Sequence, residues 1–597
     1  MNNDKNVIYN KYVYFLIGAI TVFYLINNYI WLSLNAYPHG PDEFSHLLIA
    51  QNFFNGIVSA RAEFLAEYFR LSLNSIWPPL FHFTSAVLCC LTGFSSVSPL
   101  IINLIYLVIL LFSVYSIGYK LYNKQVGILA IMLLSLYPMV FRYSRFFGLD
   151  FPQISVLCLS IYFLICTEFF LSKKFSILFG ISLGAGLLIK SAFILFLAGP
   201  LVCIILQSVF LKGQKSKYLY ARAVNLFLSL AVGAFISLSW YLPSYSATLI
   251  RLKTFFRTFA HHPSVGQAID KTSAVFRIDK FFDYLRILVN EQISFLFFII
   301  LILALFFFLK KRSYKLFLVC WYVVPYMMLS LSFQKEGRFM LSALPAIALI
   351  SAAGLQELFS YRFSSRLKHP FFILIIFLGL MQFFDVSYNY DRKDKTFPFR
   401  TPVGLMHVFC CSATEQNGWE LYGPPFKKDW KIDKIAVSII QDSRDKFKPG
   451  PVLVGLIGED AYVKRVFDFP NVLNYYLVRQ APGQAFAVVN FLPTPRQGDR
   501  IFVEDLDSLN YVVFISGVKS WPEFNDFWPA LNKFKARAKS LNKLYKDLYG
   551  IEKPYDFKDA AGKLSRFLVE KDQRFSLFDK IKLPDGYYAY IYARLGD

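Results

Sequence analysis

The residues of this chain that could do chemistry stand beside long apolar runs. Asp42 and Glu43 form an acidic pair after Pro41, and Asp150, Lys190 and Arg338 each interrupt or border an apolar stretch. A carboxylate at a hydrophobic boundary has a raised proton affinity, so it can take a proton from a hydroxyl group. Lysine and arginine can neutralise a phosphate, arginine by bidentate hydrogen bonding. These residue types predict proton abstraction beside a bound anion.

The acidic residues also have a structural interpretation. Acids stabilise the first turn of a helix, and both Asp42 and Asp150 stand where an N-cap is expected. His46 lies four residues after Asp42, so on a helix the two side chains share a face. We expect His46 to form hydrogen bonds rather than to transfer protons.

The basic residues have alternatives too. Lys190 could extend its ammonium group to the membrane interface, and Tyr241 could belong to an aromatic belt. Arg145 precedes Asp150 in the same predicted turn. Arg338 begins a predicted helix, where a positive charge is unfavourable with the helix dipole, so we expect it to have an anionic partner. A single phosphate would satisfy both Lys190 and Arg338.

Composition places the chain in a membrane. It has 597 residues, of which 56% are hydrophobic, whereas soluble domains average about 45 to 50%. The net charge of +23 comes mainly from short basic clusters between apolar runs, so it indicates membrane topology rather than nucleic-acid binding. The eight cysteines show no metal-ligand spacing, so they indicate no metal site; a divalent metal is possible but not indicated.

Eleven apolar segments are long enough to suggest membrane crossings, because a spanning helix needs about 20 apolar residues. The linker after every second segment is basic, and basic loops stay in the cytoplasm. The segments run approximately over 12–34, 98–119, 126–143, 150–171, 175–189, 191–211, 222–243, 291–309, 314–333, 338–356 and 370–388.

This topology puts the other linkers outside, including the external loops 35–97 and 244–290. The candidate residues then all lie at the outer ends of helices. Residues 77–95 are apolar, but a crossing there would place every later basic loop on the outer side of the membrane. We therefore expect them to enter the outer leaflet and return, or to lie at the interface.

The composition changes near Asp391, which divides the chain into a transmembrane domain (1–390) and a soluble domain (391–597). The second part has short strand-like runs at 452–458, 485–491, 511–516 and 587–594, and a helical stretch from Pro522 to Tyr549. The fold class predicted is an α-helical polytopic membrane protein with about eleven transmembrane helices, interfacial helices and a C-terminal extracytoplasmic α/β domain.

Six segments follow one another over roughly residues 37–355: PDEFSHLLIAQNFFNG, WPPLFH, SLYPMVFRYSRFFGLD, GISLGAGLLIKSAF, SWYLPSY and SFQKEGRFMLSALPAIALI. In this order they resemble the GT-C class of membrane glycosyltransferases, in particular the protein O-mannosyltransferases and the lipid A aminoarabinose transferase.

The resemblance implies transfer of a sugar, with inversion, from a polyprenyl-phosphate carrier to an acceptor lipid, glycan or protein. It implies that Asp42 is the catalytic base, Asp150 the second acidic residue, and Glu43 a support for the acceptor or the base. Lys190 and Arg338 would bind the carrier phosphate, so no metal or other cofactor is required. The location implied is a bacterial inner membrane, with the site on the periplasmic side. Asn103 departs from the arginine common in the family.

Two other classes of function fit some of these features. Ionisable residues at membrane depth also mark transport paths, so the main alternative is a transporter or lipid flippase. Against it, the sequence shows no inverted repeat, and the candidate charges lie on one side of the membrane rather than at its midplane. A non-enzymatic scaffold that presents the C-terminal domain is the third possibility.

Overall fold

A computed structural model describes the following parts of the chain: residues 11–35, 41–59, 77–95, 97–210, 216–246, 248–249, 281–310, 314–330, 336–360, 367–389, 397–402, 404–408, 423–425, 429–446, 452–458, 469–481, 486–490, 509–516 and 575–595. The chain forms two compact units. The first comprises Met1–Leu34, Ile49–His261 and Ala274–Pro425, and the second Asn35–Leu48, His262–Ser273 and Phe426–Asp597.

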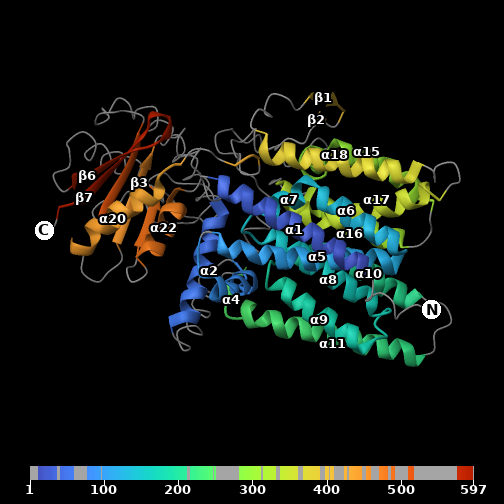
Figure 1. Cartoon of the computed structure of the whole chain (residues 1–597). Helices are drawn as coiled ribbons and strands as arrows, with labels where there is room; N and C mark the ends of the chain where they lie inside the picture. Colours follow the sequence, from blue (N-terminus) through green and yellow to red (C-terminus); the bar gives the residue numbers. More distant parts are fainter. Residues whose placement is uncertain are drawn as a thin grey trace, which may run out of the picture. The chain divides into compact units, whose positions relative to one another are not determined.

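The first unit is a bundle of helices that lie side by side, and a helix occupies each of the eleven expected segments (Figure 1). The helices are α1 (Lys11–Leu34), α4 (Leu80–Thr92), α5 (Ile102–Leu121), α6 (Lys124–Leu136), α7 (Pro138–Tyr143), α8 (Asp150–Cys166), α9 (Lys173–Leu187), α10 (Phe193–Phe210), α11 (Ser216–Tyr241), α14 (Asp283–Ile287), α15 (Ser294–Phe308), α16 (Lys315–Ser330), α17 (Leu344–Leu358) and α18 (Lys368–Tyr388). Helix α2 (Pro41–Ser59) begins in the second unit and ends in the first.

The protein is an integral membrane protein. Within the described residues, five helices are long and apolar enough to cross a bilayer, and a sixth span results if α14 and α15 are counted as one bent span. Five further apolar helices have 10 to 17 residues. Helix α4 is one of these; its 13 residues rise about 20 Å, less than the hydrocarbon thickness. The count of eleven crossings stays a prediction.

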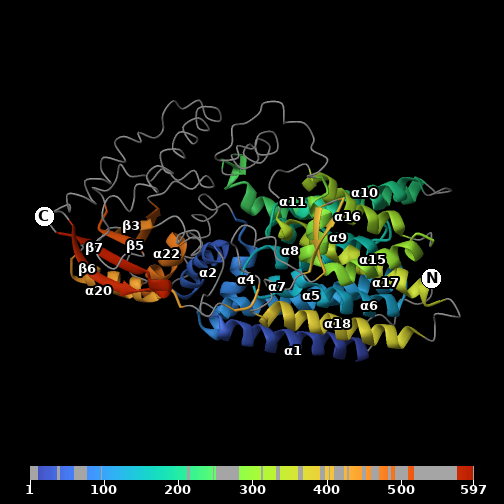
Figure 2. The same cartoon turned by 90° about the horizontal axis from the view of Figure 1, so that it is seen from above.

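Small residues let neighbouring helices approach closely, which is how membrane helices gain packing energy without a hydrophobic effect between them. A Cβ atom added at Gly180 of α9 would lie 2.5 Å from the carbonyl oxygen of Ser229 on α11. Nearby, the Ser229 hydroxyl donates to the carbonyl of Ser176 at 2.8 Å. Helices α1 and α18 also lie together, with the rings of Phe23 and Phe383 at 4.9 Å (Figure 2).

Two breaks in the helices differ from the uninterrupted segments expected. Tyr137 is extended and Pro138 follows, so the segment 126–143 divides into α6 and α7. The segment before α15 contains a π-helical turn, η2 (Leu288–Gln292), and the chain bends by 116° between Asp283–Gln292 and Ser294–Phe308. The segment 338–356 begins with a 3-10 turn, η3 (Gly337–Ala343), that continues into α17.

The second unit contains a five-stranded sheet in the order β4-β3-β5-β7-β6. Strands β3 (Val452–Gly458), β4 (Phe486–Asn490) and β5 (Tyr511–Ser516) are parallel, and β7 (Tyr588–Arg594) is antiparallel to both β5 and β6 (Phe575–Lys582). All four expected strands are present. Strand β6 was not expected, and the predicted helix from Pro522 to Tyr549 lies outside the described residues.

Helices α20 (Ile432–Lys446) and α22 (Phe469–Gln480) accompany the sheet (Figure 1). Ser438 of α20 donates a hydrogen bond to Asp579 of β6 at 2.7 Å, and Tyr511 of β5 donates to Asp442 of α20 at 2.8 Å. The α/β composition is therefore as predicted. The hairpin of β1 (Pro398–Thr401) and β2 (Gly404–His407), which follows residue 391, groups with the helical unit instead.

Candidate functional site

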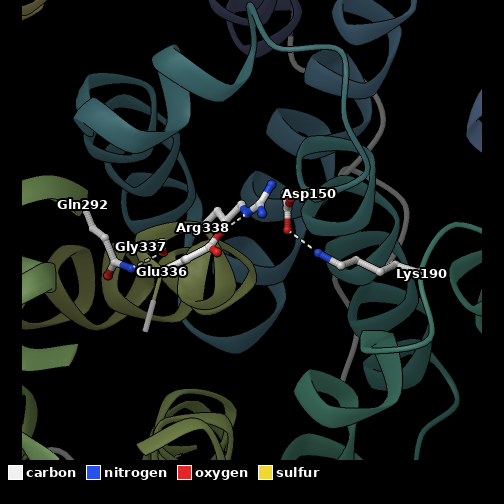
Figure 3. A network of polar contacts seen from close by, with 6 residues as sticks. All are labelled: Asp150, Lys190, Gln292, Glu336, Gly337 and Arg338. Carbon is white, nitrogen blue, oxygen red and sulfur yellow. Dashed lines mark hydrogen bonds and ion pairs between the residues drawn. The ribbon is translucent and has the colours of Figure 1, made fainter. Parts of the chain in front are cut away.

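Asp150 and Lys190 form an ion pair between two helix ends. Asp150 is the first residue of α8, as the sequence predicts, and its Oδ1 atom lies 2.6 Å from Nζ of Lys190. Lys190 lies between α9 and α10, also as predicted, and its side chain is about 20% exposed. The two residues are 40 positions apart in the chain, with α8 and α9 between them, so the fold brings these two groups together (Figure 3).

Arg338 and Glu336 form a second ion pair. Glu336 is extended, and Arg338 is the second residue of η3, so the two side chains can turn toward each other; the Nε–Oε2 distance is 2.6 Å. Lys190 Nζ and Arg338 Cζ lie 5.9 Å and 5.7 Å from the centre of the Phe339 ring. The Arg338 guanidinium extends toward Asp150 (Figure 3). We call Asp150, Lys190, Glu336 and Arg338 the paired-charge cluster.

The helix break before α15 holds the backbone beside Arg338. Gln292 Nε2 donates to the carbonyl oxygen of Gly337 at 2.6 Å. A Cβ atom at position 337 would lie 2.6 Å from Glu291 Oε2 and 2.6 Å from Met139 Cε, so only glycine fits without displacing these side chains. Glu291 and Gln292 are buried, and neither was among the site residues predicted from the sequence. The sequence feature that could have indicated them is the presence of two polar residues at the start of the apolar run at 291–309.

Arg145 lies in the same turn as predicted, but its described contacts are with other helices. Its Nε and NH2 atoms donate to Asn28 on α1 at 3.3 Å and to Ser387 on α18 at 2.6 Å. Its guanidinium lies over the aromatic rings of three side chains at 5.4 to 5.6 Å, namely Trp31, Phe141 and Phe383. Its role in substrate binding stays a prediction. We call Arg145 with Asn28 and Ser387 the Arg145 network.

Asn103 holds the backbone on both sides of Arg145. The Nδ2 atom of this buried residue on α5 donates to the carbonyl oxygens of Ser144 at 3.2 Å and Phe146 at 2.9 Å. These bonds fix the turn that leads into Asp150. The residue that departs from the family pattern therefore supports the backbone of the site.

Tyr241, the last residue of α11, contacts the end of α9, a few residues before Lys190. Its hydroxyl donates to the carbonyl oxygen of Leu187, the last residue of α9, at 3.0 Å. This bond ties the end of α11 to the short connection that carries Lys190. Tyr241 thus supports the position of Lys190, and its direct contact with a substrate stays a prediction.

The acidic segment at 42–46 belongs to the second unit. Asp42 lies in the first turn of α2, and its side chain is outside the described part of the structure. Glu43 and His46 are buried. Between them, Phe44 packs against Tyr475 of α22, with the ring centres 5.4 Å apart. The sequence VLNYYLV, which contains Tyr475, therefore packs against the helix that carries the predicted base within this unit.

The paired-charge cluster can bind an anion. It has two cations from different helix ends, and each is only partly buried. An incoming phosphate could accept hydrogen bonds from both cations by competing with the carboxylates of Asp150 and Glu336, which already pair with them. Within the described residues there is no group of three histidine, cysteine or acidic side chains arranged to hold a metal ion.

Comparisons with known proteins agree with the fold. The sequence model of the dolichyl-phosphate-mannose-protein mannosyltransferase family matches residues 77–236. The structure of ArnT from Cupriavidus metallidurans bound to undecaprenyl phosphate has a TM-score of 0.54 at 12% identity, covering 98% of both chains. The apo structure of the same protein has a TM-score of 0.50 at 12% identity, covering 87% of this chain and 94% of that chain. No curated protein sequence matches significantly.

Proposed function

We propose that this membrane protein, which has the fold of the GT-C class of glycosyltransferases as the sequence resemblance predicted, transfers a sugar from a polyprenyl-phosphate carrier to an acceptor. The paired-charge cluster is the observation that carries the proposal. Lys190 and Arg338 come from distant parts of the chain and share the ring of Phe339. A lipid phosphate is an anion that such a pair can bind at the end of a helix bundle.

The transfer is an in-line displacement with inversion. The acceptor oxygen forms a bond to the anomeric carbon, while the bond from that carbon to the phosphate oxygen breaks and its electron pair stays on the phosphate. Asp42 takes the proton of the acceptor hydroxyl as general base. Lys190 and Arg338 neutralise the charge that develops on the departing phosphate, which removes the need for a metal ion.

The remaining predicted residues support these roles. Asp150 keeps Lys190 oriented through its 2.6 Å contact. Glu43 supports the acceptor or the base, and His46 supplies hydrogen bonds in the same segment. The carrier tail lies in the bilayer. The reaction takes place at the outer interface of a bacterial inner membrane, with the C-terminal domain on the same, periplasmic side, and the acceptor is a lipid, a glycan or a protein.

Turnover of a labelled donor tests this proposal. The purified full-length protein, reconstituted in sealed lipid vesicles, is incubated with a labelled polyprenyl-phosphate sugar and cell extract. We expect labelled product and free polyprenyl phosphate in equal amounts. Movement of the donor across vesicles without product formation would instead support a transporter or flippase.

Asp42→Asn tests the general base. We expect a loss of turnover of about 100- to 10,000-fold, the usual contribution of a general base, with unchanged folding and carrier binding. The matched control is Asp433→Asn, since Asp433 is an exposed acid in the first turn of α20 in the same unit. Turnover by Asp42→Asn close to that of Asp433→Asn would reject Asp42 as the base.

A further inference from the structure

Both cations of the paired-charge cluster already have a carboxylate partner. Asp150 contacts Lys190, and Glu336 contacts Arg338, each at 2.6 Å. The two pairs differ in exposure: the Glu336 side chain is 27% exposed and that of Asp150 only 9%. Separating a pair costs less where water can solvate the released carboxylate. Glu336 is therefore the carboxylate that can leave its cation more readily.

The charge of the ligand changes during the proposed reaction. A sugar donor on a polyprenyl phosphate is a phosphodiester with a single negative charge. The carrier left after transfer is a phosphate monoester, with a charge of about −1.5 to −2 at neutral pH because its second pKa is near 6. A site that held the phosphate with two cations alone would bind this product more strongly than the donor.

We propose that Glu336 is a built-in competitor for Arg338 that promotes release of the carrier phosphate after transfer. This inference rests on the proposed function and extends it to product release. When a phosphate occupies the cluster, Arg338 binds the phosphate. When Glu336 takes Arg338 back, the phosphate loses one of its two cations and dissociates.

The backbone around this pair favours exchange by side chains alone. Gly337 lies between Glu336 and Arg338, and its carbonyl oxygen accepts the 2.6 Å hydrogen bond from Gln292. Glu291 leaves no room for a side chain on the α-carbon of Gly337. The segment that carries both groups is thus held in place. Rotation of the Arg338 side chain can then change its partner while the backbone stays where it is.

Binding of undecaprenyl phosphate to the full-length protein in nanodiscs tests the proposal. We expect Glu336→Gln to bind this carrier about two- to tenfold more tightly than the unmodified protein, the size expected for a partly exposed ion pair. We also expect its steady-state turnover to fall relative to its single-turnover rate, because product release becomes slower. The control is Glu357→Gln, at the other end of α17, which should change neither quantity.

Two further comparisons identify the cause. The double variant Glu336→Gln/Arg338→Gln should bind undecaprenyl phosphate no more tightly than Arg338→Gln does, since Glu336 acts through Arg338. Equal or weaker binding by Glu336→Gln, or a gain that persists in the double variant, would overturn the competitor role while leaving the transferase intact. Failure of the unmodified protein to bind the carrier and to turn over the donor would instead reject the proposed function, and this inference with it.

Discussion

The paired-charge cluster and the Arg145 network are both built on charged residues at helix ends, yet their partners differ. Lys190 and Arg338 each contact a carboxylate and remain partly exposed. Arg145 is buried, donates to a neutral amide and a hydroxyl, and lies over three aromatic rings. Exposed cations with exchangeable anionic partners suit ligand binding. A buried cation with neutral partners from several helices suits support of the bundle.

Replacement of Lys190 should have the largest effect on activity. We expect Lys190→Met to lower turnover about 100- to 1,000-fold, as for loss of one group that stabilises a developing negative charge. The melting temperature should fall as well, because the carboxylate of Asp150 is only 9% exposed and loses its cationic partner, so turnover is measured on the folded variant. The matched control is Lys434→Met on the exposed face of α20, and both variants are compared by donor turnover and thermal unfolding. Normal turnover by Lys190→Met would remove Lys190 from the phosphate site.

Replacement of Arg145 should mainly reduce stability. Arg145→Met leaves Asn28 and Ser387 buried without their donor, and an unsatisfied buried polar group costs about 1 to 3 kcal/mol. We therefore expect a lower free energy of unfolding, measured by denaturant titration in detergent micelles. The KM for the donor, measured on the folded variant, tests the binding role predicted from the sequence, and an unchanged KM would remove Arg145 from the substrate-binding residues. A free energy of unfolding equal to that of the unmodified protein would show that the Arg145 network does not support the bundle.

The smallest expected effect concerns pH and the hairpin that packs on the helix break. Burial lowers the pKa of His407 below its usual 6.5. The unfolded chain then binds a proton at a higher pH than the folded chain does, so stability falls as the pH drops below about 6.5. His407→Gln should show a smaller loss of stability between pH 7.5 and 5.5. Equal pH dependence in both proteins would show that His407 does not contribute.

The hairpin also shows how the helix break is completed. Asn290 donates to the carbonyl oxygen of Leu405 at 3.1 Å and accepts from the amide of His407 at 3.0 Å. A polar side chain in the π-helical turn η2 thus pairs with a strand about 115 residues away. Sequence patterns do not reveal such a partner, because nothing in the local spacing of either segment refers to the other.

Local chemistry in the sequence determined much of the architecture. Apolar runs predicted the positions of the membrane helices, since a backbone in a bilayer must satisfy its own hydrogen bonds. Alternating and β-branched residues predicted β3, β4, β5 and β7. The same reasoning placed Asp150 at the start of a helix and Lys190 between two helices. Those are properties of residues close together in the chain.

Only the tertiary structure decided which of these groups meet. It paired Lys190 with Asp150 across 40 residues, and it brought Phe339 beside both Lys190 and Arg338. It also turned Arg145 toward α1 and α18 and created the bend that holds Gly337. Such contacts depend on how helices pack and where they break, and packing is set by the shapes of many distant side chains together rather than by any one segment.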